Sequence, residues 1–128
     1  MPRDGGSRGA PKQDAIVRKT PDTFPDILAE ILRPYLADSS MNIHLAAEAA
    51  GTSVRTLQRA LREFGLSYSA LMERERNLKA RSLLANTNAK IIEVAYELGY
   101  QNPAHFSRAF RLTTGLSPRE FRASNEYV

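Results

Sequence analysis

Four polar residues near the middle of the chain are spaced so that one helix would present them together. At about 100° per residue they fall in a single sector, opposite a sector of apolar residues. The polar sector holds Arg55, Gln58, Arg59 and Arg62. A guanidinium group can bind the O6 and N7 atoms of guanine, and a glutamine amide can do the same for adenine. The chemistry that this pattern favours is recognition of a partner, not bond breaking.

The chain contains an internal repeat of two matching segments. AAEAAGTSVRTLQRALREFGLSYSAL at 46–71 matches VAYELGYQNPAHFSRAFRLTTGLSPREF at 94–121, with one residue inserted before the middle helix of the second copy and one after it. LQRALR at 57–62 aligns with FSRAFR at 106–111, so each copy carries a basic second helix. A duplicated unit of this kind indicates a protein that contacts a periodic partner twice, and duplex DNA is the commonest such partner.

The sequence lacks the residue patterns that metal binding and nucleophilic catalysis require. The chain has no cysteine, and no carboxylates surround His44 or His105 at metal-ligand spacing, so we expect no metal site. The serines fall at predicted helix caps, and no glycine-framed nucleophile elbow is present. A small helical enzyme is therefore the weakest alternative. The sequence predicts no catalytic residues, no metal and no cofactor.

Composition is ordinary for a globular protein but basic. Eighteen Lys plus Arg stand against fourteen Asp plus Glu, which gives a net charge of +4 and a pI near 9.7. This balance favours an anionic partner. No apolar run approaches the roughly 18 residues of a membrane span, and no secretory signal is present. We expect a soluble protein of the cytoplasm, located on the chromosome when bound to DNA and with no membrane partner.

The sequence of the first half of the chain predicts a tail followed by a helical unit. Residues 1–22 are rich in Gly, Pro and charge, which is typical of a disordered tail or linker. A helix is expected from Thr23 and must end or kink near Arg33 because Pro34 follows. Glycine at 51 is suited to a turn between two short helices. Ser53 can cap the second of them; its predicted core face consists of Val54, Leu57, Leu61 and Phe64.

The second half predicts a long helix and a second unit. Ser67 can cap a helix that runs to about Ala85, and apolar residues on all its sides would let its two ends serve two cores. Its length is roughly 28 Å, close to one turn of B-DNA. Asn102-Pro103 is a strong helix start, with Phe106 and Phe110 facing the core. Ser117-Pro118-Arg119-Glu120 forms a capping box for a terminal helix that ends near Ala123.

These residues resemble the DNA-binding module of the AraC/XylS family of bacterial transcription regulators. The resemblance covers about 24–123, and its most specific strings are RTLQRALREFG at 55–65 and IIEVAYELGYQNPAHFSRAFRLTTGLSPREFR at 91–122. It implies an all-α fold of about seven helices, with two helix-turn-helix subdomains at 23–66 and 87–128. A linker helix at 67–86 would join them. Both recognition helices would enter successive major grooves of the DNA.

The resemblance also implies which side chains touch DNA. Base contacts are expected from Arg55, Gln58, Arg59, Gln101, Asn102, Ala104, His105 and Arg108. Phosphate contacts are expected from Ser53, Thr56, Arg62, Ser107 and Arg111, and Tyr100 beside the second turn could add one. Because Pro103 and Ala104 offer no side-chain hydrogen bond, the second helix is expected to discriminate less and to favour at most a thymine methyl group.

The sequence thus predicts a sequence-specific regulator of transcription that binds double-stranded DNA and acts as an activator, with RNA polymerase as a further partner. Many relatives carry a separate effector-binding or dimerisation domain, for which residues 1–22 are too few. The chain is either a stand-alone regulator or the C-terminal piece of a longer one. The alternative function is that of a helical adaptor that uses its basic faces on an acidic protein.

Overall fold

The computed structural model describes residues 23–126, which form α-helices, one short 3-10 helix and no strand. The predicted tail at 1–22 lies outside the described residues. The elements in chain order are α2 (Phe24–Leu32), η1 (Arg33–Tyr35), α3 (Ile43–Ala49), α4 (Val54–Arg62), α5 (Tyr68–Asn86), α6 (Ile91–Glu97), α7 (Pro103–Thr114) and α8 (Pro118–Glu126). The all-α fold with seven helices is confirmed. None of the described helices is both long and apolar enough to cross a bilayer.

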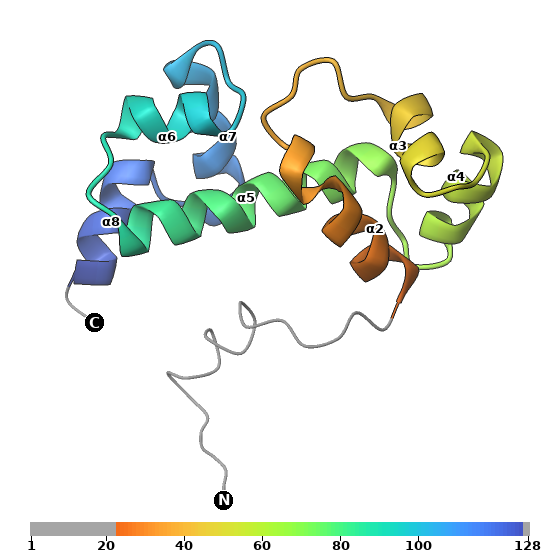
Figure 1. Ribbon diagram of the computed structural model, residues 1–128. Coiled ribbons are helices and arrows are strands. Elements are labelled where there is room, and N and C mark those ends of the chain that lie inside the picture. The colour runs from red at the N-terminus through yellow and green to blue at the C-terminus, as the bar shows by residue number, and fades with distance from the viewer. Residues whose placement is uncertain (1–22, 127–128) are drawn as a thin grey trace, which may run out of the picture.

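Helix α5 is the axis of the molecule. It passes between two groups of helices, with α2, α3 and α4 around its first half and α6, α7 and α8 around its second half (Figure 1). Its 19 residues contribute Leu71 and Met72 to one hydrophobic cluster and Ala80 and Leu84 to another. The prediction that the two ends of this helix serve different cores is therefore confirmed.

Local signals in the sequence fix where most helices start. The side chains of Ser53, Ser67 and Asn102 each accept a hydrogen bond from a backbone N–H in the first turn of the helix they precede. The capping box before α8 is also present, since Ser117 N–H donates to the Glu120 carboxylate at 2.9 Å and Glu120 N–H donates to the Ser117 hydroxyl at 3.0 Å. All four predicted starts are correct.

Helix ends were predicted less well. Pro34 ends α2 as expected, because the chain continues after Leu32 as the short 3-10 helix. Phe64 was expected in the core, but α4 stops at Arg62 and the Phe64 side chain is 49% exposed. The angle per residue used for the prediction does not hold beyond the last helical turn. Helix α8 runs to Glu126, three residues past the predicted end at Ala123.

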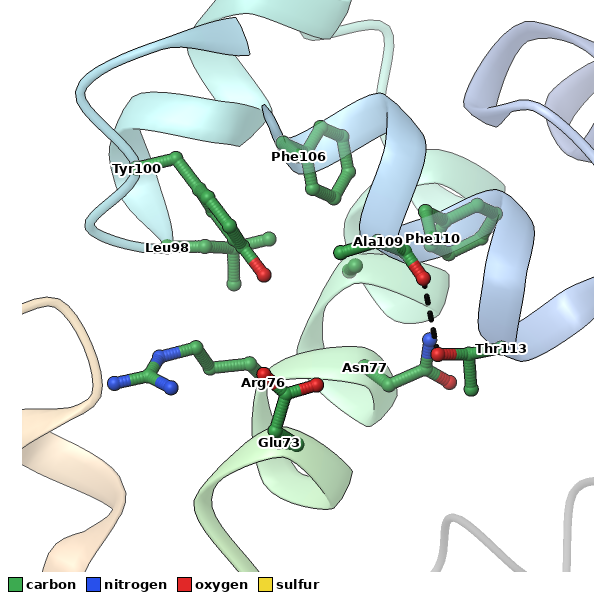
Figure 2. A pocket seen from close by; sticks show the side chains of 10 residues that line it. Glu73, Arg76, Asn77, Leu98, Tyr100, Phe106, Ala109, Phe110 and Thr113 are labelled. Atoms are coloured by element: carbon green, nitrogen blue, oxygen red, sulfur yellow. Dashed lines mark hydrogen bonds between the residues drawn. The ribbon is translucent and has the colours of Figure 1, made fainter. Parts of the chain in front are cut away.

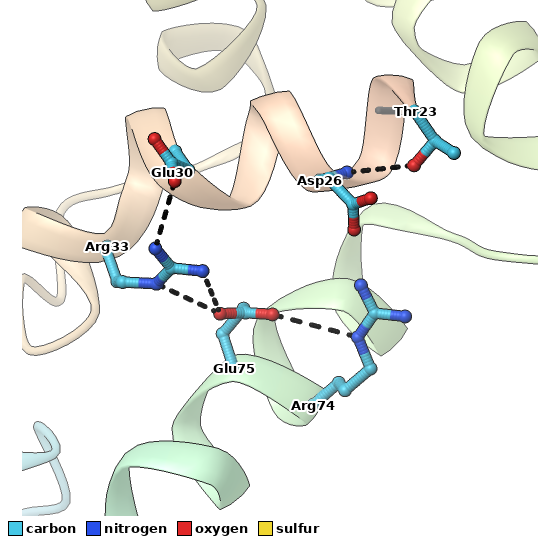
Figure 3. Close-up of polar contacts among 6 residues, drawn as sticks. All are labelled: Thr23, Asp26, Glu30, Arg33, Arg74 and Glu75. Atoms are coloured by element: carbon cyan, nitrogen blue, oxygen red, sulfur yellow. Dashed lines mark hydrogen bonds and ion pairs between the residues drawn. The ribbon is translucent and has the colours of Figure 1, made fainter. Parts of the chain in front are cut away.

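A buried carboxylate ties the first helices to α5. Glu75 is 4% exposed, and its Oε1 accepts hydrogen bonds from Nε and Nη2 of Arg33, each at 3.3 Å (Figure 3). Nε of Arg74 lies 3.7 Å from the other carboxylate oxygen. A buried charge is tolerated only when it is paired. The pairing of Glu75 with Arg33 therefore holds η1 against α5.

Candidate nucleic-acid interface

Helix α4 is held by one face and exposes the other. Gly51 takes a φ of +71° at the turn after α3, a conformation that glycine adopts without strain. Leu57 and Leu61 are fully buried in the first cluster. The opposite face carries the predicted stripe, which is exposed at every position: Arg55, Gln58, Arg59 and Arg62. The predicted contact residues of α4 therefore share one outward surface.

The start of α4 can receive a phosphate. The Ser53 hydroxyl accepts from Thr56 N–H at 3.1 Å and donates to the Thr56 hydroxyl at 3.0 Å. The Thr56 hydroxyl hydrogen is then left for an outside acceptor. The N–H groups of Val54 and Arg55 precede the first intrahelical hydrogen bond, which runs from Leu57 N–H to Ser53 O. Such groups, with the helix dipole, attract anions.

Helix α7 is held in the same way in the second unit. Phe106 and Phe110 are each 2% exposed in the second cluster, and their rings lie 5.7 Å apart. The predicted contact residues of this unit lie on the opposite side and are exposed, except for half-buried Ser107. The exposed ones are Gln101, Asn102, Ala104, His105, Arg108 and Arg111.

The start of α7 differs from the start of α4, because its backbone donors are already used. Pro103 has no N–H, and Ala104 N–H donates to Oδ1 of Asn102 at 2.8 Å. His105 N–H donates to the Asn102 carbonyl at 3.0 Å. Capping leaves Asn102 only its Nδ2 group for a base. An anion would therefore find fewer donors at α7 than at α4.

The two helices also differ in how far their charges are neutralised. Nη1 of Arg111 lies 3.6 Å from the Glu120 carboxylate, and both side chains are more than half exposed. The Ser117 N–H bonded to Glu120 holds the pKa of that carboxyl below its usual value, and the Arg111 charge adds to this effect. Within residues 23–126 no carboxylate pairs with the arginines of α4. The pattern in the sequence indicated the capping role of Glu120 but not its pairing with Arg111, because Arg111 lies on a different helix.

Tyr100 takes a packing position. Its ring centroid lies 5.5 Å from that of Phe106, and its side chain lines a small cavity together with Arg76 of α5. Burial raises the pKa of the Tyr100 hydroxyl. The structure thus gives the ring of this half-buried residue a packing role, and the phosphate contact suggested by the sequence stays a prediction.

The pairing of a short helix, a glycine turn and an exposed basic helix occurs at α3–α4 and again at α6–α7. The family model described as "Helix-turn-helix domain" matches residues 46–124, from α3 to α8. The chain belongs to this family, as an AraC-type DNA-binding domain. The resemblance seen in the sequence is therefore confirmed. The family consists of DNA-binding domains of transcription factors and not of enzymes.

Known proteins agree with this assignment. The chain is 34% identical over 102 residues to the HTH-type transcriptional activator RhaS of Escherichia coli, an alignment that covers 79% of this chain and 36% of RhaS. It thus spans about a third of that relative's length. The structure of a DNA-binding transcriptional dual regulator from Escherichia coli K-12 superposes with a TM-score of 0.78, at 22% identity, covering 87% of this chain and 99% of the other. The DNA-binding domain of AdpA, solved in complex with a target DNA, gives a TM-score of 0.70 at 24% identity, covering 83% and 96%.

Proposed function

We propose that this chain binds double-stranded DNA sequence-specifically and regulates transcription by placing α4 and α7 in successive major grooves. The observation that carries the proposal is the presence of two exposed basic helices at the two ends of one long helix. The 19 residues of α5 correspond to roughly 28 Å, near the about 34 Å that separates equivalent points on one face of B-DNA. One chain would then span two half-sites.

The predicted contacts remain part of this proposal. Base edges are contacted by Arg55, Gln58 and Arg59 from α4, and by Gln101, Asn102, Ala104, His105 and Arg108 from the second unit. Ser53, Thr56, Arg62, Ser107 and Arg111 contact phosphates. Their exposure supports these roles. The first helix-turn-helix unit is 23–66, the linker is 67–86, and the second unit is 87–128.

The whole protein is proposed to be an activator in the bacterial cytoplasm. RhaS, the relative of 34% identity, is a transcriptional activator. Activation through contact with RNA polymerase follows from that likeness, and so does control by an effector-binding or dimerisation domain on the same polypeptide. In either case this chain would recognise the specific site on the DNA.

Selection from random duplexes tests the proposed function. We expect a monomer to enrich one asymmetric site of about 20 base pairs, because two recognition helices lie in one chain about a helical turn apart. Each well-read base pair should cost about 1–3 kcal/mol of binding free energy when changed. The costs should be larger in the half contacted by α4, whose arginines are paired with no carboxylate of residues 23–126 and whose first N–H groups precede the intrahelical hydrogen bonds. Footprinting on the enriched duplex locates the two halves.

Four outcomes would contradict the proposal in different ways. Protection of a single half-turn would rule out two recognition helices, and strict dependence on inverted half-sites would rule out binding as a monomer. Larger costs in the half contacted by residues 101–108 would reverse the ranking of the two helices. Retention that depends on salt but not on sequence would favour an adaptor that binds acidic partners through its charge.

The pairing of Arg111 with Glu120 yields a separate prediction. Glu120→Gln keeps the acceptor of the capping box, since glutamine serves there as well, but it releases Arg111 for a phosphate. We expect DNA to bind about two- to fivefold more tightly at low salt and the salt dependence to become steeper. Titration of the selected duplex at several salt concentrations measures both effects.

Glu93→Gln is the matched control. Glu93 accepts from Lys90 N–H at 2.8 Å at the start of α6, so this change removes the same charge from the matching carboxylate position of a helix start, although Lys90 has no side-chain acceptor to complete a capping box. It should raise affinity less, because no cation is released. Equal gains for the two variants would mean that net charge alone is responsible.

A further inference from the structure

The two halves of the described chain have separate cores. The buried and half-buried residues of the first cluster come from α2 to the first half of α5, and those of the second come from the second half of α5 to α8. No described residue belongs to both clusters. The relative orientation of α4 and α7 must therefore depend on α5 and on whatever contacts the two halves make directly.

One direct contact is a close approach of two backbone segments. Gly99, at the turn between α6 and α7, faces Ala37 in the segment after η1. A Cβ atom on Gly99 would lie 3.0 Å from Ala37 Cα, 3.1 Å from its carbonyl oxygen and 3.2 Å from its carbonyl carbon. These atoms belong to the backbone and cannot turn away as a flexible side chain could. The missing Cβ of Gly99 is what allows the second unit to rest on the first.

A glycine turn between the two helices of a unit does not by itself bring another backbone segment close to the glycine. Gly51 occupies the equivalent turn between α3 and α4 with a similar positive φ, +71° against +92° for Gly99. Nothing lies within 4 Å of a Cβ atom built on Gly51. Both turns need glycine for its conformation, but only the second also needs it for space.

Arg76 of α5 reaches the same segment from the other side. Its Nε donates to the Leu36 carbonyl at 3.2 Å, across 40 residues of sequence. Its side chain also lines a cavity of about 20 Å³ with Leu98 and Tyr100 of the second unit (Figure 2). Arg76 thus donates to the residue directly before Ala37 and lines one cavity with the two residues that flank Gly99.

The electrostatics of the cavity agree with this placement. Burial raises the pKa of the Tyr100 hydroxyl most, the Glu73 carboxylate raises it further, and the Arg76 charge lowers it. The side chains of α5 and of the second unit are therefore near enough to influence one another.

The second unit contains a hydrogen bond that corresponds to the one between Arg76 and Leu36. Leu84 stands seven residues before Ile91, as Leu36 stands seven before Ile43. The Leu84 carbonyl accepts from Nε of Arg122 at 3.0 Å, and Arg122 belongs to α8 of the same unit. In the first unit the corresponding carbonyl is bonded by Arg76, whose surroundings include the other unit. The two donors lie on matching helices of the repeat, α5 and α8, so the duplication has kept the hydrogen bond, and the cavity beside Arg76 adds Leu98 and Tyr100 of the other unit.

We propose that the contact of Gly99 with Ala37 and the hydrogen bond of Arg76 to Leu36 form a joint that fixes the orientation of α4 relative to α7, and that this joint sets the half-site spacing which the protein accepts. The first part concerns the chain alone, and the second rests on the proposed function. A rigid connection favours one spacing strongly, because a second contact gains from the first only when the geometry lets both form.

The first part is tested by a distance measurement without DNA. The chain has no cysteine, so Glu63→Cys and Leu112→Cys place two spin labels, one just after α4 and one on α7, at exposed positions. We expect a narrow distance distribution in the parent pair. Adding Gly99→Ala should broaden or shift it, whereas Gly51→Ala, which also places alanine at a positive φ but meets no atom within 4 Å, should leave it unchanged.

Arg76→Met provides a second variant in case Gly99→Ala impairs folding. It removes the hydrogen bond to Leu36 and adds no clash, so its distance distribution should also broaden. Circular dichroism confirms that each variant keeps its helices. Unchanged distributions in folded Gly99→Ala and Arg76→Met proteins would overturn the joint, as would equal broadening by Gly51→Ala.

The second part is tested with duplexes that carry the selected site with zero, one or two base pairs inserted between its halves. Parent protein should lose about tenfold in affinity or more on the first insertion, because it can then engage only one half fully. The joint variants should lose less than the parent on the same insertion. Equal losses for all proteins would show that α5 alone sets the spacing. If no duplex is selected at all, the proposed function fails while the distance measurement still decides the joint.

Discussion

Phe106→Ala is expected to lower the free energy of unfolding of the second unit by about 3–5 kcal/mol. The ring is 2% exposed and lies between those of Tyr100 and Phe110, at centroid distances of 5.5 and 5.7 Å. Removing it opens a cavity where α7 packs on α6, and this packing helps to orient the outward face of α7. Urea denaturation followed by far-UV circular dichroism measures the loss.

The shape of the unfolding curve carries a second expectation. A loss of this size is a large part of the 5–15 kcal/mol that is typical of small domains. Because the two clusters share no described residue, the variant should unfold in two steps, with α6–α8 first. Leu112→Ala is the control on the same helix; its side chain is 84% exposed, so it should change stability by less than about 0.5 kcal/mol. One cooperative transition at the parent midpoint in Phe106→Ala would contradict this account.

Features that depend on a few neighbouring residues were predictable from the sequence. A cap such as Ser53 and a turn such as Gly51 act within three or four positions along the chain, and the structure has both where they were expected. The apolar face of each second helix follows from its periodicity, so the opposite face could be assigned as well. The exposure of Arg55 and Arg108 is a consequence of that local pattern.

Features that depend on contacts between distant segments were not predictable in this way. Arg33 and Glu75 are 42 residues apart, and nothing in the spacing of either residue indicates its partner. Gly99 was interpreted only as a turn residue, because its closeness to Ala37 exists only once both halves are folded. The pairing of Arg111 with Glu120 was missed for the same reason. The first of these contacts ties η1 to α5, the second brings a turn of the second unit against the first unit, and the third neutralises a charge on α7.

The resemblance to a known family predicted more of the fold than the periodicity of the sequence did. Periodicity alone indicates a basic face on α4 and on α7, which a solvated surface helix would also have. The matched strings at 55–65 and 91–122 identified the fold and its duplication together. They did not assign roles to single side chains with equal force, since Tyr100 turned out to pack on Phe106.

Arg59→Ala and Arg108→Ala are each expected to weaken binding to the selected duplex by about 1–3 kcal/mol and to remove the preference at one particular base pair. The two arginines occupy equivalent positions of the repeat, and both are exposed on the outward faces of their helices. A guanidinium that binds a base edge distinguishes guanine from the other bases. Its loss should therefore make the site tolerant at that position while the other positions keep their costs.

Two further variants separate this effect from loss of charge in general. Arg62→Ala should weaken all duplexes to a similar degree and reduce the slope of log K against log salt by about one, as expected for a phosphate contact. Lys79→Ala should change little, because Lys79 lies half-buried on α5, a helix that carries none of the predicted contact residues. Titration of each variant against single-base-pair substitutions of the site, at two salt concentrations, distinguishes the three behaviours. A larger loss for Lys79→Ala than for Arg59→Ala would place the DNA along α5 and overturn the assignment of α4 and α7 as recognition helices.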